Sequence, residues 1–181
     1  VEEAARRGLP NIANTVDAIA VLKAEKNLAL MEKHAVLSRI EMESRCEILY
    51  ENYIKTINIE ALTMIEMAKR QIVPAVIAFK GHLADTISSV DAIGCDVSVE
   101  KSLCDAVSQQ FVSLRKNLTL LETSLSEAGA LHGDTVAQAA AYRDLVFTAM
   151  GLLRQDADKL EELVDAKFWP FPTYSDMLFN V

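Results

Sequence analysis

Long stretches without glycine or proline constrain this chain more than any other feature of its sequence. Only 6 glycines and 4 prolines are spread over 181 residues, so the chain has few of the residues from which tight turns are built. A β-sandwich or a loop-rich disulfide scaffold needs many such turns. Because 51% of the residues are hydrophobic, we expect one all-α domain, an antiparallel bundle of long, partly kinked helices.

Charge and the length of apolar runs exclude several classes of protein. Eighteen Lys and Arg stand against 26 Asp and Glu, a net charge of −8, which repels nucleic-acid phosphates and anionic lipid. No apolar run approaches the roughly 20 residues that span a bilayer, and residues 1–14 lack the basic and apolar regions of a secretory signal. We therefore expect a cytoplasmic protein with neither nucleic acid nor a membrane as partner.

The cysteines predict neither disulfides nor a zinc site. Cys46, Cys95 and Cys104 are an odd number and show no CxxC spacing. We interpret them as small hydrophobic residues in a reducing compartment.

Residues 1–37 are expected to form a leading segment with short helices. Residues 1–14 are polar and are predicted to be irregular. Asn14 is placed to cap a helix over Thr15–Leu22, and a second short helical pattern runs from Ala24 to about His34.

The strongest start signal for a helix follows this leading segment. Ser38 and Glu41 have the spacing of a capping box, in which each side chain accepts a hydrogen bond from the other residue's backbone N–H. The helical pattern then continues to Gly94, which is placed to end it. Pro74 lies inside this pattern, so we expect a kink or a break near Gln71.

Two further long helices are predicted over residues 98–128 and 134–167, the second capped by Asp134. Their apolar residues alternate at spacings of mostly three and four, as in the seam of a packed bundle. With the helix over 38–94 they complete a bundle over residues 38–168. The seam residues are Val107, Phe111, Leu114, Leu118, Leu121, Leu125 and Ala128, then Val146, Met150, Leu153, Ala157, Leu160 and Val164.

Residues 169–181 form a C-terminal tail rich in aromatic residues and proline. The prolines stop the helix and stiffen the segment, so we expect it to lie extended in a groove of its own bundle or of an adjacent subunit, with a last short turn near its end. A frayed terminus is the alternative. The candidate packing residues are Trp169, Phe171, Tyr174, Leu178 and Phe179.

The long central helix carries apolar residues on several faces, which predicts that neighbours cover it. Asn52, Thr56, Asn58 and Thr63 interrupt this apolar pattern. Polar groups in a covered helix need partners. They either fix the register between helices or contact a neighbouring domain or subunit, and both interpretations stay open.

No motif in the sequence predicts a catalytic, cofactor-binding or metal site. His34, His82 and His132 are not preceded by the Glu-x-x-His pairs of a di-iron bundle. The glycines form neither a P-loop nor a dinucleotide fingerprint. We therefore assign no catalytic, cofactor-binding or metal-binding residue.

Several long segments of the sequence resemble one family. The clearest covers residues 48–76, ILYENYIKTINIEALTMIEMAKRQIVPAV, and others are RRGLPNIANTVDAI, EKHAVLSRIEMESRCEIL and WPFPTYSDMLF at residues 6–19, 32–49 and 169–179. Together they resemble the C-terminal region of the type III glutamine synthetases. They follow the family's order and include both ends of the chain.

The resemblance implies a parent enzyme of nitrogen metabolism that condenses glutamate with ammonia. Such an enzyme uses ATP with Mg²⁺ or Mn²⁺, forms homo-oligomeric stacked rings and carries its catalytic residues on an upstream domain. Residues 1–37 would join that domain, which is absent here. None of its catalytic residues can be carried onto a position of this sequence.

Two functions remain for the chain. It is a non-catalytic accessory domain that supports subunit packing in a glutamine synthetase, with the catalytic domain and neighbouring subunits as partners. Alternatively, it is a free-standing helical adaptor that binds a partner helix in a groove.

Overall fold

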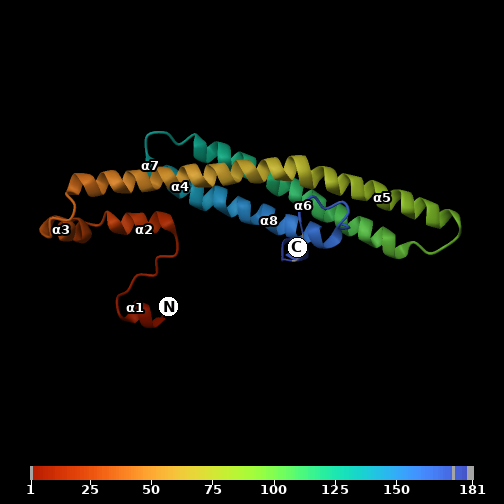
Figure 1. Cartoon of the computed structure of the whole chain (residues 1–181), viewed down its shortest axis with the longest axis horizontal. Helices are drawn as coiled ribbons and strands as arrows, with labels where there is room; N and C mark the ends of the chain where they lie inside the picture. The colour runs from red at the N-terminus through yellow and green to blue at the C-terminus, as the bar shows by residue number, and fades with distance from the viewer. Residues whose placement is uncertain (1, 173, 179–181) are drawn as a thin grey trace. The chain divides into compact units, whose positions relative to one another are not determined.

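The computed structural model of the chain describes residues 2–172 and 174–178 (Figure 1). Within those residues it contains helices and no strand, so the predicted all-α class is confirmed. The α-helices are α1 (Glu2–Arg6), α2 (Thr15–Leu22), α3 (Glu25–Lys33), α4 (Arg39–Met67), α5 (Val73–Ala92), α6 (Ser98–Gly129), α7 (Thr135–Ala141), α8 (Thr148–Leu163) and α9 (Tyr174–Leu178), with π-helical turns η1 (Ala68–Ile72) and η2 (Tyr142–Phe147).

The chain divides into two compact units, each defined by the contacts among its own residues. The first unit consists of residues 1–60 and 125–147, and the second of residues 61–124 and 148–181. This grouping does not test the boundaries expected after residues 37 and 168, which stay a prediction.

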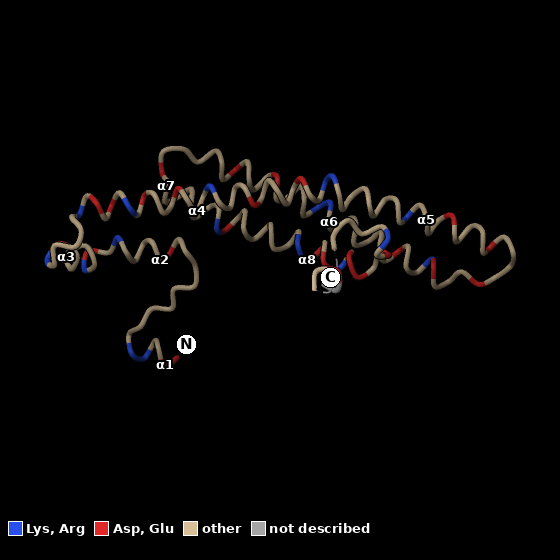
Figure 2. Tube along the Cα trace, in the orientation of Figure 1, with Lys and Arg blue, Asp and Glu red and all other residues tan. Residues whose placement is uncertain are grey.

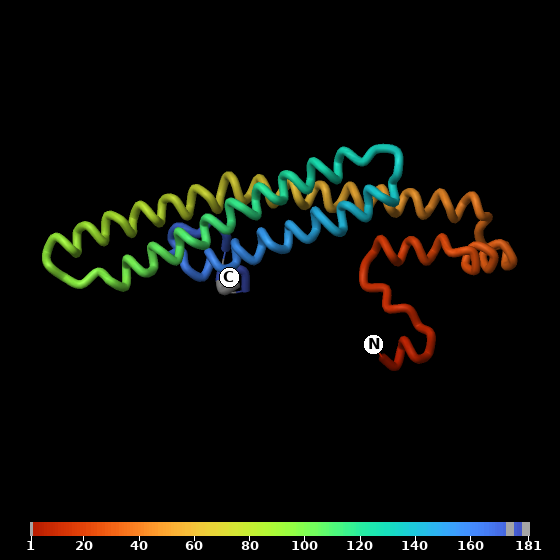
Figure 3. The backbone as a smooth tube through the Cα atoms, turned by 180° about the vertical axis from the view of Figure 1, so that it is seen from behind, coloured from red at the N-terminus to blue at the C-terminus, as the bar shows by residue number. Residues whose placement is uncertain are grey.

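The core of the first unit joins α2 to the early part of α4. Figures 1 and 3 show these two segments side by side. Val16 and Ile19 of α2 pack with Cys46 and Tyr50 of α4, and Ala139 of α7 completes the cluster. The buried Tyr50 hydroxyl donates a hydrogen bond to the Val16 carbonyl at 3.4 Å, so the polar end of this ring is satisfied inside the core.

The predicted helix starts of the first unit are confirmed by their hydrogen bonds. The Asn14 side chain accepts from the Asp17 N–H at 2.9 Å, and the Ser38 N–H donates to the Glu41 carboxylate at 2.8 Å. Asp134 accepts from the N–H three residues later at 3.0 Å and begins α7 after the turn seen in Figure 3. Each cap satisfies a backbone donor that has no partner within its helix.

An arginine in η2 ties this π-helical turn to α2. The Arg143 guanidinium donates one hydrogen bond to the Asp17 carboxylate at 2.8 Å. It donates two more to the Asp144 carboxylate, at 2.6 and 2.8 Å. This guanidinium holds the pKa of the Asp144 carboxyl below its usual value. The turn contains no proline, and no feature of the sequence indicated it.

The second unit is built from α5, most of α6 and α8. Buried aliphatic side chains of these helices, among them Val76, Leu114, Leu121, Leu153 and Leu160, form its core. Most residues of the predicted α6 and α8 seams are buried, which confirms the helical period from which they were predicted.

Gly94 ends α5 as predicted and lets the chain turn back into α6 (Figure 1). Its φ is +79°. The N–H of Gly94 donates to the Asp91 carbonyl and that of Cys95 to the Val90 carbonyl, at 2.9 and 3.3 Å. This pair of bonds is the Schellman arrangement, which requires a left-handed residue at this place.

The disturbance expected before Pro74 is a π-helical turn rather than a break. Residues Ala68–Ile72 form η1, and α5 continues directly from Val73. Because proline has no N–H and crowds the preceding turn, the bonding pattern widens there instead of keeping the α-helical spacing.

Two predicted boundaries are wrong. α8 ends at Leu163 rather than near Lys167, because the Asp165 side chain accepts the Lys167 N–H at 2.8 Å and starts a turn that competes with the helix. Residues 2–6, expected to be irregular, form α1, in which Glu3 pairs with Arg6 and Arg7.

Charges of both signs alternate along the helices, as Figure 2 shows. Among the residues that the structure describes, no helix combines the length and the apolar character needed to cross a membrane.

Two glycine substitutions should change stability in opposite directions. Gly94→Ala is expected to lower the free energy of unfolding by about 1 to 2 kcal/mol, because alanine is strained at this positive φ. The matched Gly81→Ala, inside α5 and equally open to a new methyl group, should raise it by about 0.5 to 1 kcal/mol. Urea unfolding followed by circular dichroism measures both, and a stabilised Gly94→Ala would contradict the role of this turn.

Candidate docking surface

The side chains that could hold a metal ion do not cluster in residues 2–172 and 174–178. No three His, Cys, Asp or Glu residues in these ranges lie close enough to hold a metal ion. His34 and His132 are exposed, and the His82 ring packs against Phe168 with their centroids 5.5 Å apart. Surfaces and buried polar contacts are therefore the candidate functional features.

The four polar residues predicted on the central helix have different surroundings. Asn58 is half-buried and accepts a hydrogen bond from the Tyr142 hydroxyl of η2 at 3.1 Å. This bond supports a role in register for Asn58. Asn52, Thr56 and Thr63 are exposed in this chain, so contact with a neighbouring domain stays a prediction for them.

The expectation that neighbours cover the apolar faces of α4 is wrong for part of this helix. In the first unit, its buried face carries Met42, Cys46 and Tyr50. On other sides of the helix Ile40 is 78% exposed and Ile48 is 54% exposed. α4 does carry apolar residues on several faces, as predicted, but no described segment of the chain covers these two side chains.

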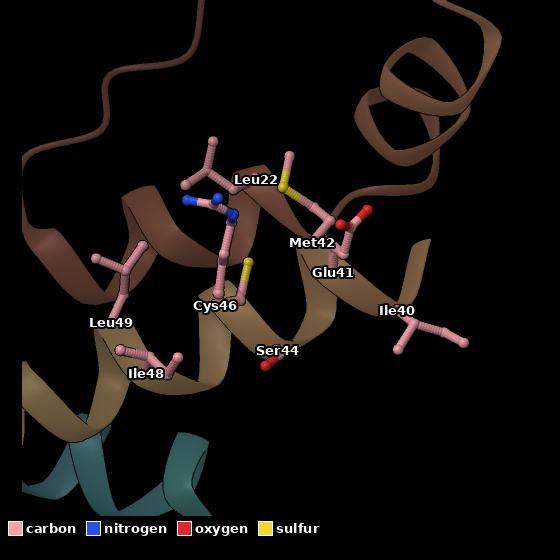
Figure 4. Close-up of a pocket in the computed structure, with 9 residues that line it drawn as sticks. Leu22, Ile40, Glu41, Met42, Ser44, Cys46, Ile48 and Leu49 are labelled. Carbon is pink, nitrogen blue, oxygen red and sulfur yellow. The ribbon is translucent and has the colours of Figure 1, made fainter. Parts of the chain in front are cut away.

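A groove between α2 and α4 lies within this exposed region and has a volume of about 620 Å³. Figure 4 shows Leu22 of α2 facing Met42 and Cys46 of α4. Burial raises the pKa of the Cys46 thiol, so this residue contributes an uncharged, apolar surface to the lining of the groove. The lining residues are Leu22, Ile40, Glu41, Met42, Ser44, Arg45, Cys46, Ile48 and Leu49.

The two charged side chains of the groove are not equivalent. Glu41 accepts hydrogen bonds from Ser38, and the backbone bond lowers the pKa of Glu41 most, so its carboxylate is already engaged. Arg45 is exposed and makes no hydrogen bond or ion pair with any residue that the structure describes. The charge of Arg45 also helps to lower the pKa of Glu41, so the groove offers a guanidinium with unused hydrogen-bond donors beside an aliphatic surface.

A buried carboxylate in the second unit was missed by the sequence reasoning. Asp156 of α8 is only 5% exposed. It accepts from Gln110 at 2.7 Å, from Ser113 at 3.0 Å to each oxygen, and from Asn117 at 2.6 Å, all on α6. These neutral donors replace the water that a buried carboxylate loses.

The spacing of the donors could have indicated this contact. Gln110, Ser113 and Asn117 follow one another at three and four residues, so they share a face of α6. Ala157 was predicted in the α8 seam, but the adjacent Asp156 is the buried residue and Ala157 is half-buried. Nothing in the sequence of α8 distinguishes Asp156 from its exposed acidic neighbours.

The ring just before the tail packs on α5, and two rings of the tail pack on each other. Phe168 lies 5.6 Å from Phe79 between ring centroids, and Trp169 meets Phe171 edge-on at 6.0 Å. Trp169 is 9% exposed, and its buried Nε1–H has no hydrogen-bond partner among the residues that the structure describes. Leu178 of α9 is exposed.

Two of the predicted tail contacts are not described. The Tyr174 side chain and the whole of Phe179 lie outside the described part of the structure. The role of the tail residues in contacts with other parts of an enzyme stays a prediction.

Comparison with known proteins decides the family. The sequence model of the glutamine synthetase C-terminal domain matches residues 1–91. The chain belongs to this family. A glutamine synthetase of Butyrivibrio fibrisolvens is 32% identical over 100% of the chain, and a type-3 glutamine synthetase of Dictyostelium discoideum is 31% identical over 98% of it. The resemblance to the C-terminal region of type III glutamine synthetases is therefore confirmed.

This glutamine synthetase domain spans about a quarter of the curated relatives it matches. The matched share is 26% of the Butyrivibrio fibrisolvens protein and 25% of the Dictyostelium discoideum protein. The match to a glutamine synthetase of Bacteroides fragilis, 26% identical over 99% of the chain, also covers 25% of that relative.

Removal of the buried carboxylate should destabilise the glutamine synthetase domain. Asp156→Ala leaves the Gln110, Ser113 and Asn117 donors without their acceptor, which costs about 1 to 3 kcal/mol of unfolding free energy. The control is Asp158→Ala, two residues away on the exposed surface, and it should stay within about 0.5 kcal/mol of the wild type. Equal urea midpoints for both variants would show that the buried network contributes nothing.

Deletion of residues 169–181 should lower the thermal midpoint of the domain by about 3 to 10 °C, because it removes the packed Trp169 and Phe171 rings. A chain that ends at Pro172 is the control and should keep most of this stability. If the tail docks between chains instead, light scattering will show a change in oligomeric state. The docking prediction is wrong if the deletion alters neither melting nor scattering.

Proposed function

We propose that this domain is the non-catalytic C-terminal part of a larger, cytoplasmic, homo-oligomeric glutamine synthetase, in which it packs against the catalytic part of the same chain and supports contacts between subunits. The parent enzyme would join glutamate and ammonia with ATP. The observation that carries this proposal is the match of the whole chain to a quarter of proteins named glutamine synthetase.

The residues of this domain do not fit the cofactors implied for the parent enzyme. Phosphoryl transfer with ATP and Mg²⁺ or Mn²⁺ needs clustered carboxylates for the metal and cationic clamps for the phosphates. Among residues 2–172 and 174–178 the structure contains no such cluster of metal ligands. We therefore assign the reaction to the remaining three-quarters of the parent chain and derive no catalytic step here.

The exposed apolar surface supports a packing role. Ile40, Ile48 and several further aliphatic side chains of the first unit are open, and apolar patches of this kind are typical of surfaces that meet another protein or domain. A free-standing adaptor would use the same surface. The matches favour the accessory-domain hypothesis over the free-standing adaptor, because the matched region is one part of a longer chain in each relative.

The 181-residue chain should not form glutamine. A coupled assay with glutamate, ammonia, ATP and Mg²⁺ or Mn²⁺ should give no product above background, while the full-length parent enzyme is active under the same conditions. Glutamine-forming activity that co-purifies with the 181-residue chain at every chromatographic step would contradict the non-catalytic assignment.

A second experiment tests the packing role in the full-length enzyme. Deletion of the region that corresponds to residues 15–181 should change its oligomeric state, measured by light scattering. If the shortened enzyme keeps both its assembly and its activity, the proposed supporting role is wrong.

A further inference from the structure

The groove between α2 and α4 is an apolar surface of the first unit that the described residues leave open. Ile48 is 54% exposed at its edge, and Leu22, Ile40 and Leu49 are also open. Figure 4 shows that these side chains come from two helices, and all four line the groove. Isolated exposed aliphatic residues are ordinary, but a contiguous group around a groove marks a place where another segment docks.

The chain outside the structure provides a tethered occupant. The relatives are about four times as long as this chain, and the family model is that of a C-terminal domain, so in the proposed parent enzyme the catalytic part would precede residue 1. Fourteen residues connect that point to α2, whose last residue, Leu22, lines the groove. A segment held this close has a high effective concentration at the groove and needs little intrinsic affinity to fill it.

Charge defines the chemistry of the occupant further. Arg45 borders the groove, makes no hydrogen bond or ion pair with the described residues and acts on Glu41 only through its charge, whereas the Glu41 carboxylate is hydrogen-bonded to Ser38. An aliphatic segment that buries the groove would also desolvate part of Arg45. This cost is recovered if the segment brings a carboxylate, which a guanidinium can bind through two parallel hydrogen bonds.

We propose that the groove between α2 and α4 receives a segment of the preceding catalytic part of the same parent chain, with aliphatic side chains against Leu22, Ile48 and Leu49 and a carboxylate facing Arg45. This inference rests on the proposed packing role and specifies where that packing occurs. A second copy of this domain is the competing occupant.

Cysteine labelling tests whether the groove is covered. Ile48→Cys is made in a Cys95→Ser background, because Cys95 is an exposed thiol, both in the 181-residue chain and in the full-length enzyme. We expect maleimide to label position 48 about tenfold or more slowly in the full-length enzyme. The matched control is Ile77→Cys on α5, since Ile77 is 56% exposed, and its labelling should slow much less.

Photo-crosslinking identifies the occupant. With p-benzoylphenylalanine in place of Ile48 in the full-length enzyme, peptide mass spectrometry should find a link within one chain, to a segment before residue 1 that contains aliphatic residues and an Asp or Glu. Arg45→Glu should weaken this link and accelerate labelling of Ile48→Cys. A link to residues 1–181 of another copy, or equal labelling rates in the short and full-length proteins, would overturn the proposal.

The two possible failures can be told apart. If deletion of residues 15–181 disrupts assembly while position 48 labels equally fast in both proteins, the accessory role stands and this groove is not the packing site. If the deletion changes nothing and position 48 is unprotected, both proposals are wrong.

Discussion

The burial of one aliphatic seam on α6 is the interaction on which the second unit depends. Leu114, Leu118 and Leu121 have almost no exposed surface, and each such side chain contributes about 1.5 to 3 kcal/mol relative to an exposed position. The other features of this unit are arranged around that seam. Asp156 is tolerated beside it because three neutral donors of the same helix surround its carboxylate, and the tail begins where Phe168 can rest on Phe79.

The first unit combines an apolar cluster with hydrogen bonds between its helices. Its buried apolar cluster is small, and hydrogen bonds of Tyr50, Tyr142 and Arg143 connect α2, α4 and η2. Its surface leaves a groove open. A unit with a small core and an unfilled apolar surface is well suited to complete its packing with another part of a larger protein.

Features that depend on neighbours in the sequence could be predicted, and features that depend on distant residues could not. The caps at Asn14, Ser38 and Asp134 and the left-handed Gly94 follow from chemistry within a few residues. Pro74 located the disturbance in the long helix but not its π-helical form. The burial of Asp156 depends on donors about forty residues away, and the exposure of Ile48 depends on which segments fold over α4.

The π-helical turn before Pro74 also gives the second unit a place where its length can vary. Ala68, Ile72 and Val76 are buried at successive spacings of four, followed by Phe79 and Leu83 at three and four, whereas an unbroken α-helical seam alternates three and four. The turn holds one residue more than an α-helical turn would, and it keeps the seam directed to the core on both sides. Over evolutionary time such a turn can absorb the gain or loss of a single codon, which elsewhere in the helix would rotate every following side chain by about 100° around the helix axis.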